Sequence, residues 1–311
     1  MSVSPHNEKT FDPTAGETTE DDDWFGYHPG LLKPAASQRR KDPQPQQDWR
    51  AHLPADEDWV GQSISEEVLE GPRTLVPVRA IQELGNVPQA LVFSRLLYWC
   101  APHNRRRRVP MCTDDGFYWL TKTHRGLAAE TGLSARTVRN AVGELARKGL
   151  VLVEYVASAG GRTSRFRIVR EVDLVVREDD EWRRVYVPAW SVRYLRSTGR
   201  HRGHAEQALV LGQVLYWFRP RRDGTPRIRV RLDERFWLAK SHAELANEVG
   251  LSRQTVRTSL DVLEGEGLIV SRCARFQGIP TTHLRPDARA IENAMLAVES
   301  DRSAALDESE E

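Results

Sequence analysis

The feature that most constrains the fold of this chain is an internal duplication. The stretch GLSARTVRNAVGELARKGL, residues 132–150, returns 118 residues later as GLSRQTVRTSLDVLEGEGL, residues 250–268. With that offset, residues 89–167 align with residues 207–285 without a gap, and 28 of the 79 aligned pairs are identical. Self-similarity over this length indicates one structural unit present twice. We call residues 89–167 repeat 1 and residues 207–285 repeat 2.

The first part of each repeat has the residue pattern of a helix followed by a strand. Residues 89–100 are apolar on nearly every side, which predicts a helix buried on more than one face. The segments FYWL, residues 117–120, and RFWL, residues 235–238, have the composition of short strands. The same pattern therefore opens both repeats.

Start and stop signals predict a second helix after each strand. Ser241 and Glu244 have the spacing of a capping box, and Thr123 is the corresponding, weaker cap in repeat 1. Gly132 and Gly250 follow as helix ends, because glycine readily adopts the left-handed conformation that terminates a helix.

The duplicated stretch itself predicts a helix with one buried face, which we call the third helix of each repeat. Ser134 and Ser252 are placed as its N-caps, and Gly149 and Gly267 as its ends. Its apolar positions step by four and three residues and so share one face. These positions are Val138, Val142 and Leu145 in repeat 1 and Val256, Leu260 and Leu263 in repeat 2. A β-hairpin is expected after each third helix, with turns at SAGGR and QGIP.

The order helix, strand, helix, turn, helix, hairpin is thus expected twice. The motif LA.E.GLS..TVR..V..L...GL resembles winged helix-turn-helix modules, and two such modules in tandem are similar to plasmid and phage replication initiators. The resemblance covers both repeats and implies a mainly α-helical fold with small β-hairpin wings (α+β). Repressors, activators and replication proteins all use this module, so the motif does not determine the biological role.

The segments outside the repeats differ from them in composition. Residues 1–70 are rich in Pro, Asp, Glu, Gln and Thr and have few periodic apolar positions, which is typical of a disordered tail. The expected organisation is an acidic, Pro-rich tail at 1–70, winged-helix domain 1 at 75–170, an acidic linker at 171–186, winged-helix domain 2 at 187–286, and a short helix from about Asp287 to Val298 within a final acidic segment at 287–311.

Charge is distributed in blocks, although the net charge of the whole chain is only +1. Residues 78–170 hold 16 basic and 6 acidic side chains, and residues 183–289 hold 20 and 10, so each block has a net charge of +10. Residues 1–77 hold 7 basic and 15 acidic side chains. Two separate positive blocks predict a polyanionic partner, and we expect double-stranded DNA. The acidic tails are candidates for contact with replication or transcription proteins.

The exposed face of the third helix is the predicted DNA-contacting surface. In a helix-turn-helix module this helix enters the major groove with its early residues at the base edges. Arg can bridge O6 and N7 of guanine, Asn and Gln can bridge adenine, and a hydroxyl group can bind phosphate. The residues predicted to contact DNA are Ser134, Ala135, Arg136, Thr137, Arg139 and Asn140 in repeat 1 and Ser252, Arg253, Gln254, Thr255, Arg257 and Thr258 in repeat 2.

Arginines of the hairpins and of one loop are expected to add contacts to phosphate. The hairpin residues are Arg162, Arg165 and Arg167 in repeat 1 and Arg272, Arg275 and Arg285 in repeat 2. The loop residues are Arg105–Arg108 in repeat 1 and Arg219, Arg221 and Arg222 in repeat 2. Other paired residues are expected to be structural, with the indoles in the core and the imidazoles packed or facing solvent: Trp99, Trp119, Trp217, Trp237, His124 and His242.

The two third helices differ at their ends. Repeat 1 has Arg147 and Lys148, whereas repeat 2 has Asp261, Glu264 and Glu266, which would repel phosphate. We therefore expect repeat 1 to bind DNA with both ends of its third helix, and repeat 2 with the start of that helix and its hairpin. Because the residues predicted to contact bases also differ between the two third helices, we expect the DNA target to consist of two unlike half-sites.

The sequence gives no sign of an enzyme, a metal site or a cofactor. It contains no phosphate-binding loop, no nucleophile elbow and no paired metal-ligand motif, and its three cysteines are too few and too dispersed for a zinc cluster. Apolar runs are too short to span a bilayer, and no basic-then-apolar leader is visible, so we expect a cytoplasmic protein with no membrane partner.

Three roles remain open at this point. The expected role is that of a plasmid or phage-type replication initiator or origin-binding protein. The first alternative is a transcriptional regulator that binds an operator with two unlike half-sites, and the second is a winged-helix module that binds other proteins. The oligomeric state is left open.

Overall fold

The computed structural model describes residues 73–100, 111–112, 118–158, 161–169, 184–199, 202–221, 225–228, 230–233 and 235–307. The chain divides into two units, residues 1–47 and 48–311, and all described residues belong to the second unit. The expected disordered tail at 1–70 and most of the expected acidic linker, as well as Arg105–Arg108 and Arg222, lie outside the described residues.

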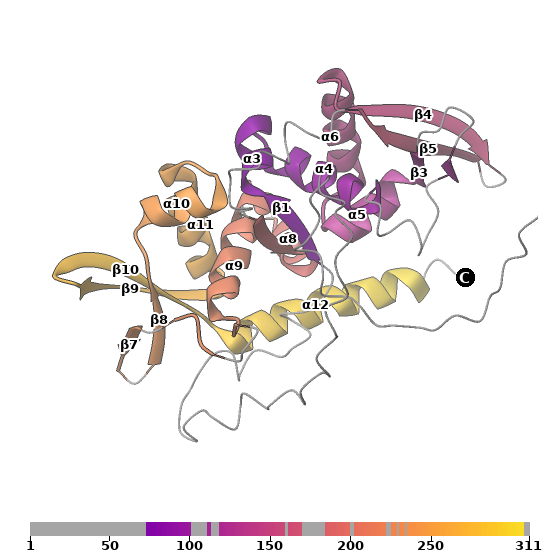
Figure 1. Cartoon of the computed structure of the whole chain (residues 1–311). Helices are drawn as coiled ribbons and strands as arrows, with labels where there is room; N and C mark the ends of the chain where they lie inside the picture. The colour runs from indigo at the N-terminus through magenta and orange to yellow at the C-terminus, as the bar shows by residue number, and fades with distance from the viewer. Residues whose placement is uncertain are drawn as a thin grey trace, which may run out of the picture. The chain divides into compact units, whose positions relative to one another are not determined.

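The second unit is a mixed α/β structure with small antiparallel sheets (Figure 1). The first half comprises β1 (Arg73–Pro77), α3 (Val78–Leu84), α4 (Val87–Cys100), β2 (Met111–Cys112), β3 (Tyr118–Lys122), α5 (His124–Thr131), α6 (Ala135–Arg147), β4 (Val151–Ser158) and β5 (Gly161–Ile168). The second half comprises β6 (Arg184–Pro188), α8 (Ala189–Ser197), α9 (His204–Phe218), β7 (Val230–Leu232), β8 (Arg235–Ala239), α10 (His242–Val249), α11 (Arg253–Gly265), β9 (Ile269–Phe276), β10 (Ile279–Pro286) and α12 (Ala288–Asp307).

Each repeat contains the predicted order of helix, strand, helix, turn, helix and hairpin. In repeat 1 these elements are α4, β3, α5, α6 and the hairpin β4–β5, and in repeat 2 they are α9, β8, α10, α11 and the hairpin β9–β10. The hairpins extend into four-stranded sheets with the orders β2-β3-β5-β4 and β7-β8-β10-β9. The third helices are therefore α6 and α11.

The local capping signals are confirmed. Ser241 Oγ accepts a hydrogen bond from the Glu244 amide at 3.2 Å, and the Glu244 carboxylate accepts one from the Ser241 amide at 2.7 Å. Thr123 Oγ1 accepts a hydrogen bond from the Gly126 amide at 2.9 Å. These side chains satisfy amide groups that the first turn of a helix leaves without a partner.

The predicted apolar face of each third helix lies in the core. Val138 and Leu145 of α6 and Val256 and Leu263 of α11 are fully buried. Burying each such side chain contributes about 1.5–3 kcal/mol relative to its exposure. The rotation of both third helices about their axes is therefore fixed, and it determines which residues face outward.

Each repeat is preceded by a strand and a helix that the sequence analysis missed. We call β1–α3, residues 73–84, arm 1 and β6–α8, residues 184–197, arm 2. The strands end in the same dipeptide, Val76–Pro77 and Val187–Pro188, but at an offset of 111 residues instead of 118. An ungapped alignment at 118 could not detect this part of the duplication. In consequence, residues 184–186, expected in the linker, form part of β6.

The helix at the C-terminal end is longer than expected. Its sequence pattern predicted a short helix that ends near Val298, but α12 continues to Asp307. Ile291, Met295 and Val298 are buried on one face of α12, and α12 packs against α8 of arm 2. Packing of this face supports the helix through its first part.

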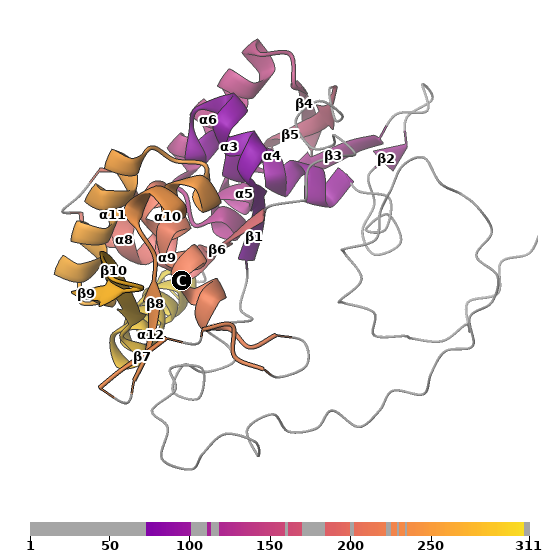
Figure 2. The same ribbon diagram turned by 60° about the vertical axis from the view of Figure 1, so that its left-hand side comes forward.

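The two arms connect the repeats. β1 and β6 form a two-stranded antiparallel sheet with Arg73 opposite Pro188 and Pro77 opposite Arg184, and they lie side by side in the middle of the unit (Figures 1 and 2). Each arm also touches the other repeat. A Cβ added at Gly132 would overlap the Ala189 carbonyl oxygen of arm 2. Apolar residues of both repeats and both arms form one continuous core.

Candidate nucleic-acid interface

The starts of the two third helices present unpaired arginines to solvent. Arg136 and Arg139 of α6 and Arg253 and Arg257 of α11 are exposed. Within the described part of the chain, these four guanidinium groups make no hydrogen bond or ion pair. Four positive charges are therefore available on the face opposite the buried stripes, near the helix N-termini, where the backbone amides also favour anions.

Neighbouring amide and hydroxyl side chains share this face. Asn140 on α6, and Gln254 and Thr258 on α11, are exposed. Gln254 Nε2 lies 3.5 Å from Thr258 Oγ1, which is the outer limit of a hydrogen bond. The residues predicted to contact DNA thus lie together at the start of each third helix, where Ser134, Ala135, Thr137 and Thr255 are only partly exposed and the others are exposed.

The predicted hydroxyl contacts belong to the helix caps. Ser134 Oγ accepts a hydrogen bond from the Thr137 amide at 3.0 Å and lies 2.8 Å from Thr137 Oγ1. Ser252 and Thr255 repeat both distances in α11. These hydroxyl groups start the third helices, and any contact they make to phosphate is additional to that function.

The histidines of the preceding helices lie partly buried near these arginines. Burial lowers the pKa of His124, and the charge of Arg139 lowers it further. The pKa of His242 is lowered by burial and then by Arg253 and Arg257, while Asp261 acts in the opposite direction. Both imidazoles therefore favour the neutral form, first because they are partly buried and second because arginines lie nearby. His124 also packs edge-on against Phe166, with 5.9 Å between ring centroids.

A partly buried carboxylate behind each surface was not predicted from the sequence. Glu130, in α5, accepts hydrogen bonds from Arg95, from Lys122 and from the Trp99 indole, the last at 2.8 Å. Burial opposes ionisation of Glu130, but these hydrogen bonds outweigh it and lower the pKa of the carboxyl group. The cluster ties α5 to α4 and β3 and so holds the helix that precedes α6.

Repeat 2 contains the same cluster with one substitution. Glu248 accepts hydrogen bonds from Lys240, from the Trp217 indole at 2.9 Å and from Gln213 at 2.8 Å, where repeat 1 has an arginine. The identity of Glu130 and Glu248 in the aligned repeats was the available signal. The expectation that the indoles are core residues holds for Trp119 and Trp237, which are buried, whereas Trp99 and Trp217 are partly exposed and belong to these polar clusters.

In the hairpin of repeat 1, the described arginines are engaged within the protein. Arg165 forms an ion pair with Glu154 at 2.6 Å, and its guanidinium lies 4.8 Å from the centre of the Trp119 ring. Arg167 is partly buried. The side chain of Arg162 lies outside the described part of the structure. This hairpin therefore offers fewer exposed positive charges than its sequence suggests.

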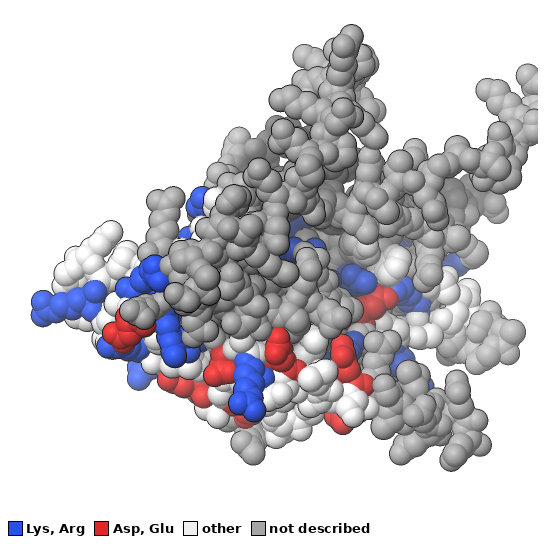
Figure 3. Space-filling view, turned by 90° about the horizontal axis from the view of Figure 1, so that it is seen from below, with Lys and Arg blue, Asp and Glu red and all other residues white. Residues whose placement is uncertain are grey.

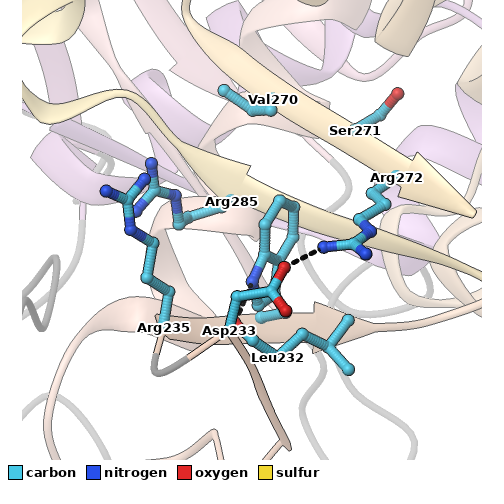
Figure 4. Close-up of a pocket in the computed structure, with 8 residues that line it drawn as sticks. Leu232, Asp233, Arg235, Val270, Ser271, Arg272 and Arg285 are labelled. Carbon is cyan, nitrogen blue, oxygen red and sulfur yellow. Dashed lines mark hydrogen bonds and ion pairs between the residues drawn. The ribbon is translucent and has the colours of Figure 1, made fainter. Parts of the chain in front are cut away.

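The hairpin of repeat 2 has a more basic outer face. Arg275 is exposed and makes no hydrogen bond or ion pair within the described residues, whereas Arg272 is paired with Asp233. A hollow of about 460 Å³ lies on this face. Figure 4 shows Arg235 and Arg285 extending to the same side of it. Its lining residues are Leu232, Asp233, Arg235, Trp237, Val270, Ser271, Arg272 and Arg285.

The basic residues at the end of α6 make contacts within the protein. Arg147 is paired with Glu144 at 2.6 Å, and Lys148 Nζ donates hydrogen bonds to the Leu84 carbonyl at 3.1 Å and to Gln89 at 3.0 Å. Lys148 therefore attaches the end of α6 to arm 1, and the expectation that this end of the helix also binds DNA stays a prediction. Among the described residues of α6, the arginines without a hydrogen bond or ion pair, Arg136 and Arg139, lie at its start.

Acidic side chains gather away from the third-helix starts. In α11, Glu264 accepts hydrogen bonds from the Ser271 hydroxyl at 2.7 and 2.8 Å. Glu299 and Asp301 are exposed on α12. Figure 3, the view from below, shows acidic and basic side chains interspersed on this face of the unit. The exposed acidic side chains of α11 thus lie beyond the arginines at its start.

Among the described helices, none is both long enough and apolar enough to cross a membrane. Within the same part of the chain, no group of three or more His, Cys, Asp or Glu side chains is placed to hold a metal ion. Comparison of the sequence with protein-family models and with curated proteins found no match.

Proposed function

We propose that this chain binds double-stranded DNA in a sequence-specific manner through two tandem winged helix-turn-helix modules. The observation that carries the proposal is the duplicated arrangement of the third helices. In both repeats one face of this helix is buried in the core, while two arginines on its opposite face are exposed and have no partner in the described structure. A long cationic helix face of this kind matches the width and the acceptor pattern of the major groove.

The chemistry of the exposed residues supports base recognition as well as phosphate contact. Arg139 and Arg257 can each bridge O6 and N7 of a guanine, and Asn140 and Gln254 can each bridge an adenine. Each such pair is worth roughly 1–3 kcal/mol of discrimination against the wrong base. Because repeat 2 has Gln254 and Thr258 where repeat 1 has Arg136 and Asn140, the two modules read unlike half-sites.

Selection from a random duplex pool tests this proposal. The wild-type chain is expected to enrich two unlike half-sites. Arg139→Ala is expected to relax the base preference of the first half-site only, and Arg257→Ala that of the second only. Arg147→Ala is the matched control, because Arg147 lies on the same helix as Arg139 but pairs with Glu144; the selected sequence should not change.

The outcomes of the selection separate DNA binding from the alternatives. If both arginine variants weaken binding equally on every sequence, these side chains contact phosphate only. If the wild-type chain binds no duplex at low ionic strength, the DNA-binding proposal fails and a winged-helix module that binds proteins becomes the better explanation.

Within this function, we propose origin binding in a plasmid or phage-type element as the biological role. The support is the resemblance of the tandem motif to replication initiators, and a role in transcriptional regulation is the alternative outcome. A plasmid that carries the selected site and this gene, but no other initiator, is expected to replicate. Loss of the plasmid, together with repression of a reporter placed behind the same site, would identify a regulator instead.

A further inference from the structure

The interface between the repeats is built from equivalent pieces of both. β1 and β6 pair antiparallel, and Leu75 faces Tyr186 at the centre of the pair. Each strand ends at a proline, Pro77 or Pro188, that begins a helix of the same arm. Two equivalent strands that pair antiparallel exchange places by a half-turn about an axis through the centre of the pair.

Contacts outside this strand pair are reciprocal. Gly132 of repeat 1 lies against Ala189, the first residue of α8, and Gly250 of repeat 2 lies against Val78, the first residue of α3. Gly132 and Gly250 are equivalent by the offset of 118 residues, and Val78 and Ala189 are equivalent by the offset of 111. When residue i of one copy contacts residue j of the other, and j of the first contacts i of the second, the interface has twofold symmetry.

The symmetric interface is part of the core and is not a flexible connection. Val76 and Val185, one from each arm strand, are fully buried. Arg193 of arm 2 donates a hydrogen bond to the Ala129 carbonyl of repeat 1. In Figure 1 the hairpins β4–β5 and β9–β10 extend to opposite sides of the central strands, as a twofold relation requires. The same relation therefore applies to α6 and α11.

We infer that the DNA target of this chain is an inverted repeat with unlike halves. The inference rests on the proposed function and adds the direction in which each half is read. Two third helices related by a twofold axis meet a duplex in opposite directions, as in helix-turn-helix dimers on pseudo-palindromic operators. Half-sites in the same direction would require modules related by translation, and the antiparallel pairing of β1 with β6 is incompatible with that.

The target is also directional, because the symmetry of the backbone is not matched by the side chains. Arg139 and Arg257 are equivalent in the aligned repeats, but Arg136 is replaced by Gln254 and Asn140 by Thr258. Each half of the site is therefore read by an equivalent arginine, Arg139 or Arg257, and by neighbouring side chains that differ between the two halves. A single chain thus recognises a dyad and distinguishes its two sides.

The first part of the test determines the order of base contacts. Bound sequences are selected from a random duplex pool with the full chain and with Arg136→Ala, Arg139→Ala, Gln254→Ala and Arg257→Ala. Each variant is expected to relax the base positions beside the side chain it lacks. In an inverted repeat, the base positions relaxed by the four variants occur in mirror order along one strand. That order is the positions read by residues 136, 139, 257 and 254, or those read by residues 139, 136, 254 and 257.

The second part measures affinity for four duplexes. One carries the selected site, one has its second half replaced by the reverse complement, one has that half scrambled, and one has five base pairs inserted between the halves. Turning or displacing the second half is expected to weaken binding about 100-fold or more, to the level of the scrambled duplex. The reason is that the second, intramolecular contact is lost when geometry forbids simultaneous binding.

The outcomes distinguish this inference from the proposed function. Base positions in the same order in both halves, or equally tight binding when the second half is turned, would overturn the inverted arrangement and leave DNA binding intact. Binding to duplex without enrichment of any sequence would overturn both the inverted arrangement and the sequence specificity of the proposed function, because no ordered half-sites would exist. Absence of binding to every duplex would contradict the proposed function itself.

Discussion

Packing of each repeat against the opposite arm can be measured at pairs of glycines. Gly132 and Gly149 have similar φ angles of 77° and 70°. A Cβ at Gly149 would meet nothing within 4 Å, whereas one at Gly132 would overlap the Ala189 carbonyl oxygen and lie 2.8 Å from Cβ of Val192. Alanine at either position strains the left-handed backbone by roughly 1–2 kcal/mol. Only at Gly132 must arm 2 also move, which adds roughly 1–3 kcal/mol as overpacking.

Urea unfolding of Gly132→Ala and Gly149→Ala isolates this added contribution. The two variants share the backbone strain and the loss of unfolded-state entropy that replacing glycine causes, so the difference between their free energies of unfolding reports contact with the arm. Gly250→Ala and Gly267→Ala form the second pair. A Cβ at Gly250 would lie 2.9 Å from Cγ1 of Val78, and one at Gly267 would meet nothing within 4 Å.

The expected order of destabilisation is Gly132→Ala first, Gly250→Ala second, and the two control variants last and similar to each other. Gly250→Ala is intermediate because its Cβ would lie 2.9 Å from a methyl group and 3.0 Å from the carbonyl oxygen of Val78, a milder overlap than the 2.3 Å to the backbone oxygen beside Gly132. The m-values must agree for the comparison to hold. Equal destabilisation of Gly132→Ala and Gly149→Ala would refute the packing of arm 2 on repeat 1.

Two further outcomes follow from the charges of the site. The pKa values of His124 and His242 are lowered in the folded chain from an ordinary 6.5, so the unfolded chain binds more protons as pH falls below that value. The free energy of unfolding is therefore expected to decrease from pH 7.5 to pH 5.5, and to decrease less in a variant with both histidines replaced by Gln. Arg275→Ala is expected to reduce the slope of log affinity against log salt by about 1, whereas Arg165→Ala, whose guanidinium pairs with Glu154, is expected to leave that slope unchanged; equal slopes for all three chains would contradict this assignment.

The elements that the sequence predicted correctly depend on local signals. Ser134, Ser241 and Ser252 each bind an amide three residues ahead, and such caps can be recognised without knowledge of the rest of the fold. The apolar stripe of α6 is equally local, because its residues lie within two turns of one another. The exposed face of each third helix followed directly from these two signals.

The parts that the sequence did not predict depend on contacts between distant residues. The arms were missed because their offset of 111 residues is out of register with the offset of the repeats, and the pairing of β1 with β6 joins segments about a hundred residues apart. Lys148 was assigned to DNA because its bond to the Leu84 carbonyl cannot be inferred from its own helix. Arg165 was likewise assigned to DNA, because its own sequence neighbours do not show that Glu154 lies opposite it on the adjacent strand and pairs with it.

Titration of a labelled duplex at low ionic strength tests the central claim most directly, namely that the exposed starts of α6 and α11 read DNA. The wild-type chain is expected to bind the selected duplex at least about tenfold more tightly than a scrambled duplex. The Arg139→Ala/Arg257→Ala double variant, with an unchanged circular dichroism spectrum, is expected to lose that preference. A wild-type chain that binds neither duplex, or a double variant that keeps the full preference, would contradict the claim.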